Sequence, residues 1–148
     1  MISAVLDTNV LASGIIGFSN VSSAPGRILR AWRDWGFNLV LSEHIIVELA
    51  RTFQAPYFLY RLTPDQVTSV LALLRSEAKI VHIVGHLQDV ATHPEDDLIL
   101  ATAVSGKVDC LVTGDRELQR LGNYQGVRIL SPRSFLDLLS TELPDREL

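Results

Sequence analysis

The sequence predicts a single three-layer α/β domain: a parallel sheet of about five strands with helices on both faces. Short apolar segments alternate with segments of helical pattern along the whole chain, and that alternation is typical of a parallel sheet. The chain has 148 residues, 47% of them hydrophobic, which suits one domain with a substantial core. We assign residues 1–140 to this domain and 141–148 to a polar carboxyl-terminal tail.

The first expected strand is the short apolar segment 2–6, which the polar residues 7–9 end. A helical pattern begins at residues 10–12. Residues 14–26 are rich in glycine and serine and are expected to form a loop. A helix is then expected over residues 28–35, before Gly36.

The second strand is expected at residues 37–41, and Ser42 is placed to cap a helix that runs to about residue 53. Residues 54–62 are aromatic and show no regular pattern. The sequence Thr63-Pro64-Asp65-Gln66 has the residues of a capping box, with proline in the first turn of the helix. We therefore expect a long helix to begin there.

The second half of the chain repeats the alternation and ends in a helix that begins at Ser131-Pro132. Its expected strands are residues 80–84, 109–112 and 127–130, and its expected helices are residues 93–104, 116–121 and 132–139.

Composition limits the classes of protein that fit. The net charge is −4 and there is one cysteine, Cys110, so an internal disulfide and a cysteine zinc site are both excluded. The first residues lack a signal-peptide pattern, and no apolar run approaches the roughly 20 residues that span a bilayer. We expect a cytoplasmic protein without a membrane partner, and a passive nucleic-acid binder would be more basic.

Acidic residues are expected to converge at one edge of the sheet. Asp7 follows the first strand and Asp115 follows the fourth, and ligands of open parallel sheets bind beyond the carboxyl ends of strands. Asp97 begins an apolar helix whose first turn is expected to overhang that edge. Glu48 lies beside the apolar face of its helix. Such a cluster requires a cation, and Mg²⁺ or Mn²⁺ suits carboxylate oxygens.

Four motifs carry a resemblance to one known family. They are Val5-Leu6-Asp7-Thr8-Asn9, the segment 43–49 around Glu48, the segment 94–101 around Asp97, and the segment 111–118 around Asp115. In order and spacing, from residue 2 to about residue 139, they resemble the PIN-domain ribonucleases. The resemblance implies a metal-dependent endoribonuclease that hydrolyses RNA phosphodiester bonds.

The resemblance also implies roles for particular residues. Asp7, Glu48, Asp97 and Asp115 match the family's metal-binding and catalytic acids, Asn9 and Thr113 match supporting polar residues, and Asp96 would be an auxiliary ligand. Arg116 adjoins Asp115 and is our candidate for binding the substrate phosphate. His93 stands where related sequences often have an acid, which is a departure from the family pattern.

Small stand-alone members of this family are often toxins of toxin–antitoxin pairs. The resemblance therefore implies RNA as substrate, a small antitoxin protein as partner and a homodimer. The aromatic segment 56–60 is a candidate contact surface for the antitoxin or the dimer, and equally a loop folded over the core.

Single motifs have simpler explanations. Asp7 and Asp115 are common capping residues, and acids at 95–97 favour a helix start electrostatically. Two other functions stay open: a non-catalytic PIN-like RNA- or protein-binding module, and another magnesium-dependent phosphoryl-transfer domain with Asp7 as nucleophile. The second would want a lysine near a later strand end, whereas Lys79 and Lys107 each precede a strand.

Overall fold

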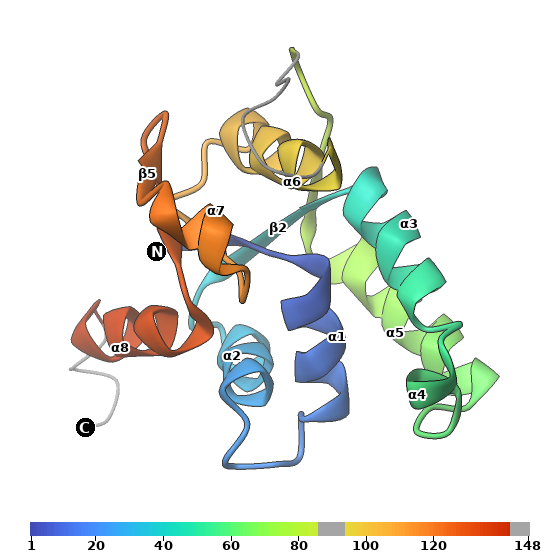
Figure 1. Ribbon diagram of the computed structural model, residues 1–148. Coiled ribbons are helices and arrows are strands. Elements are labelled where there is room, and N and C mark those ends of the chain that lie inside the picture. Colours follow the sequence, from blue (N-terminus) through green and yellow to red (C-terminus); the bar gives the residue numbers. More distant parts are fainter. Residues whose placement is uncertain (86–93, 143–148) are drawn as a thin grey trace.

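The computed structural model describes residues 1–85 and 94–142 (Figure 1). His93 and residues 143–148, most of the expected tail, lie outside this range. The first half contains β1 (Ser3–Leu6), α1 (Thr8–Ile16), α2 (Ala24–Arg33), β2 (Asn38–Ser42), α3 (Glu43–Thr52), α4 (Pro56–Leu59), α5 (Pro64–Glu77) and β3 (Lys79–Val81). The second half contains α6 (Pro94–Ser105), β4 (Cys110–Val112), α7 (Arg116–Arg120), β5 (Asn123–Tyr124), β6 (Val127–Leu130) and α8 (Pro132–Glu142).

The strands form one six-stranded sheet in the order β3-β2-β1-β4-β6-β5. All neighbouring strands are parallel except β5 and β6, which are antiparallel. This confirms the mostly parallel α/β domain. The expected number of about five strands misses β5, which has two residues and pairs with β6 across a tight turn at Gln125 and Gly126.

Helices cover both faces of the sheet. Figure 1 shows α6 on the opposite side of the strands from α1 and α2, and α8 packs against α2. The sheet and the helices packed on it share a continuous core. Within this core the rings of Phe37 and Phe135 meet edge to face, with their centroids 5.1 Å apart. Cys110 is buried in this core. None of the helices that the structure describes combines the length and apolar character needed to cross a membrane.

Local signals place most helix starts correctly. The Thr63 hydroxyl accepts a hydrogen bond from the Gln66 amide at 3.1 Å, and the Gln66 side chain accepts one from the Thr63 amide at 2.8 Å, so the expected capping box is present. Several expectations differ in extent. Helix α1 continues to Ile16, into the expected loop, and the strand expected at residues 80–84 is Lys79–Val81. Helix α2 begins at Ala24 instead of residue 28, residues 56–59 of the segment expected to be irregular form α4, and α8 continues to Glu142.

The sheet order also identifies where a ligand site belongs. The chain runs outward from β1 to β2 and β3, and then crosses back to β4 on the other side of β1. Strands β1 and β4 are in register, with Leu6 opposite Val112. Their carboxyl ends therefore form the topological switch point, where open α/β sheets bind ligands.

Candidate active site

A cleft of about 530 Å³ opens at the carboxyl ends of β1 and β4. Four carboxylate residues line it, from four separate parts of the chain: Asp7, Glu48, Asp96 and Asp115. Asp7 directly follows β1, Glu48 lies on α3, Asp96 lies in the first turn of α6 and Asp115 follows β4. The fold thus brings together acids that are up to 108 positions apart in the sequence.

Asp7 is the most enclosed of these acids, with 7% of its surface exposed. Its amide donates to the Val112 carbonyl at 2.9 Å, which extends the pairing of β1 with β4 to the cleft. Burial raises the pKa of the Asp7 carboxyl, and the charge of Asp115 raises that pKa further. Hydrogen bonds from Thr113, Asn9 and Thr8 oppose this rise in pKa without cancelling it.

Thr113 connects the two carboxylates at the switch point. Its fully buried hydroxyl donates to Asp7 Oδ2 at 2.7 Å and accepts a hydrogen bond from the Asp115 amide at 3.0 Å. One hydroxyl therefore fixes the orientation of the first acid and the backbone that carries the last. The expected role of Thr113 in supporting a catalytic site stays a prediction.

Asp115 has two structural tasks at once. It caps α7, because its Oδ1 accepts hydrogen bonds from the amides of Glu117 at 2.8 Å and Leu118 at 3.3 Å. It also lines the cleft, as Asp7 does. The simple explanation of Asp115 as a helix cap is thus correct, and it does not exclude a place in the site.

Glu48 reaches the cleft from the second turn of α3, and 19% of its side chain is exposed. One of its oxygens, Oε1, forms an ion pair with Arg51, which lies one turn further along the helix. Arg51 is mostly exposed, with 67% of its side chain accessible. An exposed arginine thus offsets the charge of an acid that faces other acids.

Two adjacent acids on α6 lie on different faces of the helix. Asp96 lines the cleft together with Ile99, three positions later. Asp97, expected as the main acid of this motif, is not among the cleft-lining residues and is 8% exposed. Consecutive helical residues point about 100° apart, so Asp97 instead shares a face with the buried Leu100 and Ala101. The structure thus brings Asp96 to the cleft, whereas Asp97 is buried on another face of α6.

The two remaining predicted residues behave differently. Asn9 is exposed and lines the cleft. Arg116, the candidate phosphate ligand, is exposed at the start of α7 and is not among the residues that line the cleft. A role for Arg116 with substrate therefore remains a prediction.

Several cleft residues were not expected from the sequence, among them His44, Thr8 and Thr52. His44 and Thr8 line the cleft, and His44 Nε2 and Thr8 Oγ1 are buried without a hydrogen-bond partner among the described residues. Buried polar atoms without a partner are uncommon and often mark a functional site. His44 lies four residues before Glu48 on α3, a spacing that puts both on one helix face, and this spacing was the available signal.

The donors in the cleft fit a hard divalent cation by their chemistry. Carboxylates, an amide and hydroxyls present oxygen atoms, which Mg²⁺ and Mn²⁺ prefer. Burial, and to a smaller extent the charge of Asp115, raises the pKa of Asp7 and so disfavours its ionised form, and a bound cation would favour that form. Within the part of the chain that the structure describes, no group of three or more His, Cys, Asp or Glu is already arranged to hold a metal ion.

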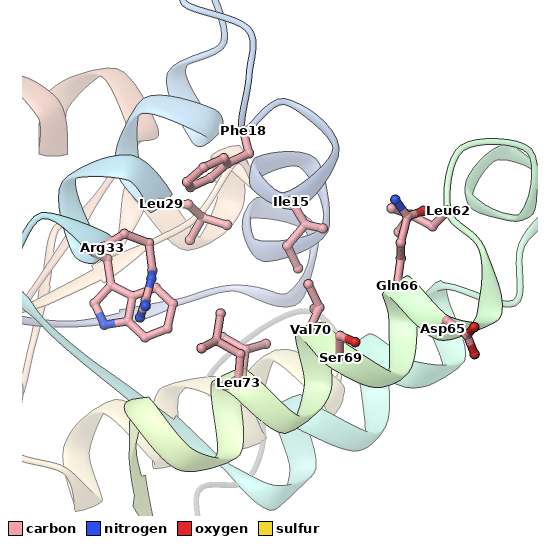
Figure 2. Close-up of a pocket in the computed structure, with 12 residues that line it drawn as sticks. Ile15, Phe18, Leu29, Arg33, Leu62, Asp65, Gln66, Ser69, Val70 and Leu73 are labelled. Atoms are coloured by element: carbon pink, nitrogen blue, oxygen red, sulfur yellow. The ribbon is translucent and has the colours of Figure 1, made fainter.

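A second hollow, the apolar groove, has a different character. It has a volume of about 500 Å³ and lies between α1, α2 and α5. Figure 2 shows Ile15, Leu29, Val70 and Leu73 around it, with Asp65 at one end. None of its lining residues also lines the acidic cleft. Its walls offer contact surface and no cluster of metal donors.

The fold and the cleft define an α/β domain with an acidic site at the switch point of its sheet. The family model of the PIN domain matches residues 3–117, and the chain therefore belongs to the PIN-domain family. No curated protein matches the chain. A similar solved structure is that of VapBC2 from Rickettsia felis bound to a DNA fragment from their promoter, with a TM-score of 0.55 and 14% identity. The match covers 88% of this chain and 98% of that one, and at this identity it shows a shared fold.

Proposed function

We propose that this PIN domain is a metal-dependent endoribonuclease whose site is the acidic cleft. The observation that carries the proposal is the meeting of Asp7, Glu48, Asp96 and Asp115 at the switch point from four separate elements. A structural explanation accounts for each acid separately, but not for their convergence in one cleft. Membership of the PIN-domain family supports the same function.

Mg²⁺ or Mn²⁺ would be held by Asp7, Glu48 and Asp115 together with Asp96 or Asp97 from α6. When bound, the metal would lower the pKa of a water molecule and offset charge on the phosphate. The protein's part is to hold the acids in place. Thr113 orients Asp7 and the Asp115 backbone, and such outer partners are worth roughly 10–100-fold in metal affinity or activity.

The direct test is cleavage of end-labelled single-stranded RNA with Mn²⁺, with Mg²⁺ and with EDTA. We expect cleavage that EDTA abolishes, and a loss in Asp7→Asn larger than the roughly 10–100-fold cost of losing an outer partner. Asp137→Asn is the matched control, because Asp137 is exposed on α8 and does not line the cleft. Equal cleavage by wild type and Asp7→Asn would refute the assignment. A DNA strand of the same sequence tests the preference for RNA.

The alternative with Asp7 as a nucleophile receives no support from the position of the lysines. The chain has two lysines, Lys79 and Lys107. Both line a hollow at the amino ends of the strands, the opposite edge from the cleft. The other alternative, a non-catalytic module, predicts RNA binding without cleavage in the same assay.

We further propose that the chain is the toxin of a toxin–antitoxin pair and forms a homodimer. The structure of similar fold contains VapBC2. In this chain the aromatic segment 56–60 exposes Tyr57, Leu59 and Tyr60, with Tyr60 90% accessible. Leu62 continues this surface into the apolar groove. Sedimentation of wild type and Tyr60→Asp tests the dimer, and a shift of the variant toward monomer is expected.

A further inference from the structure

A third hollow, the basic pocket, lies at the amino ends of β1, β2 and β3. It has a volume of about 620 Å³ and is lined by residues that include Trp35, Arg33, Lys79, Lys107 and Glu77. Along β1, from Ser3 to Asp7, it is roughly 13 Å from the acidic cleft, at 3.3 Å per residue. The two hollows share no described lining residue.

The charge of this pocket is opposite to that of the chain. The net charge of the protein is −4, yet three cations and one acid line the pocket, and both lysines of the chain are among the cations. The ion pairs found among the described residues are Glu48 with Arg51 and Glu43 with Arg75. Neither pocket lysine is in a described ion pair, and the Arg33 guanidinium lies over the Trp32 ring, 5.0 Å from its centroid. Among the described residues, no carboxylate therefore pairs with these three cations.

The backbone holds Trp35 and Lys107 in an unfavourable conformation at the wall of the pocket. Both have positive φ angles, 63° and 51°, where a residue other than glycine costs roughly 1–2 kcal/mol. Each follows the end of a helix in a Schellman motif, at the position that glycine usually takes.

The hydrogen bonds of the two motifs correspond. After α2, the Trp35 amide donates to the Trp32 carbonyl and the Gly36 amide to the Ala31 carbonyl, at 3.0 and 2.7 Å. After α6, the Lys107 amide donates to Val104 and the Val108 amide to Ala103, at 3.1 and 3.2 Å.

Both strained positions thus carry a side chain with binding chemistry. Trp35 is 73% exposed and lines the pocket. Residues that break a local rule in this way are expected at functional sites. An exposed indole beside cations is the combination that binds a nucleic-acid base and its phosphate.

We propose that the basic pocket binds a nucleotide unit, with its phosphate between Lys79, Lys107 and Arg33 and its base against the indole of Trp35. The unit is either a free nucleotide or part of a single RNA strand. Because binding is measured without divalent metal, the proposal does not depend on the nuclease activity of the cleft.

The test measures binding in EDTA with three probes: a 5′-labelled single-stranded RNA of about 12 nucleotides, AMP and inorganic phosphate. The first variant is the double change Lys79→Gln and Lys107→Asn, because asparagine tolerates a positive φ. The second is Trp35→Gly, which places the favoured residue at that backbone position. The charge-matched control is Arg120→Gln with Arg133→Gln, two exposed arginines outside the pocket.

We expect RNA or AMP to bind wild type saturably, with at least tenfold weaker binding in the double lysine variant. For RNA, the slope of log affinity against log salt should fall by about 1.4, or 0.7 for each lost phosphate contact. Trp35→Gly should weaken binding at least about fivefold, as loss of one stacked base does. The arginine control should change affinity less than twofold.

The unfolding temperature of Trp35→Gly distinguishes a binding role of Trp35 from a structural role. Relief of backbone strain should keep the unfolding temperature of this variant at or above that of wild type. Binding of RNA alone identifies a strand as the occupant, and binding of AMP as well identifies a single nucleotide. Three results would overturn the proposal: no saturable binding of either, equal loss in the lysine variant and the arginine control, or inorganic phosphate binding as tightly as AMP. RNA binding by the wild type in EDTA, with no cleavage after Mn²⁺ is added, would count against the nuclease and not against the pocket.

Discussion

Thr113→Val is the substitution that tests the geometry of the cleft most cleanly, because valine has nearly the same shape as threonine. It removes the hydrogen bond from Thr113 to the buried carboxylate of Asp7 and the acceptor for the Asp115 amide. A hydrogen bond to a charged group contributes about 1.5–3 kcal/mol. We therefore expect the free energy of unfolding to fall by about 2–3 kcal/mol at neutral pH. For a domain of this size that corresponds to a decrease of roughly 4–12 °C in the unfolding temperature.

The assay is urea and thermal unfolding followed by circular dichroism, with Thr113→Ser as the matched control. Serine keeps the hydroxyl and loses one methyl group, so it should cost about 1 kcal/mol. The cost of Thr113→Val should also be smaller in an Asp7→Asn background, where the acceptor carries no charge. The role assigned to this hydroxyl is wrong if Thr113→Val is as stable as wild type, or if Thr113→Ser lowers the free energy of unfolding as much as Thr113→Val does.

Three further predictions concern Asp7, Arg51 and Cys110. Because the pKa of Asp7 is raised in the folded chain, Asp7 lowers the free energy of unfolding as the pH rises from 3.8, the ordinary pKa of the group, through the folded-state pKa. Urea unfolding should therefore find Asp7→Asn more stable than wild type at pH 7, with the difference closing toward pH 4. A stability difference that is independent of pH would contradict this. Arg51→Gln removes the cation that is paired with Glu48, so the variant should bind Mn²⁺ a few-fold more tightly in a titration followed by electron paramagnetic resonance. An unchanged or weaker affinity for Mn²⁺ would place Glu48 outside the metal site. Burial raises the pKa of the Cys110 thiol to about 11, so Ellman's reagent at pH 8 should react with it in urea and not in the native protein, and rapid native reaction would show that this strand is accessible.

The sequence was a good guide to the architecture because each major element carries its own local signal. The capping box at Thr63 fixes the start of α5, and the apolar runs ending at Leu6 and Val112 identify the two central strands. Strand β5 had no such signal. It has two residues, and the turn that joins it to β6 places Gln125 at φ 47°, where Asn or Gly is usual.

The meeting of Asp7 and Asp115 at one edge of the sheet could be expected, since Asp7 directly follows β1 and Asp115 follows the parallel strand β4 after two intervening residues. The sequence did not show which acid on α6 would line the cleft. Three consecutive acids occupy residues 95–97, and the rotation of the helix about its axis is set by how Leu100 and Ala103 pack, both of which are fully buried. His44 carried a weaker signal, its position four residues before Glu48 on the same helix face.

The most direct test of the metal site is a crystal of the protein soaked in Mn²⁺, with the ion located by its anomalous scattering. We predict Mn²⁺ in the cleft, within about 2.3 Å of a carboxylate oxygen of Asp7 and of at least two oxygens from Glu48, Asp96, Asp97 or Asp115. An ion bound only elsewhere, or a cleft that stays free of Mn²⁺ at millimolar concentration, would contradict the metal-dependent mechanism.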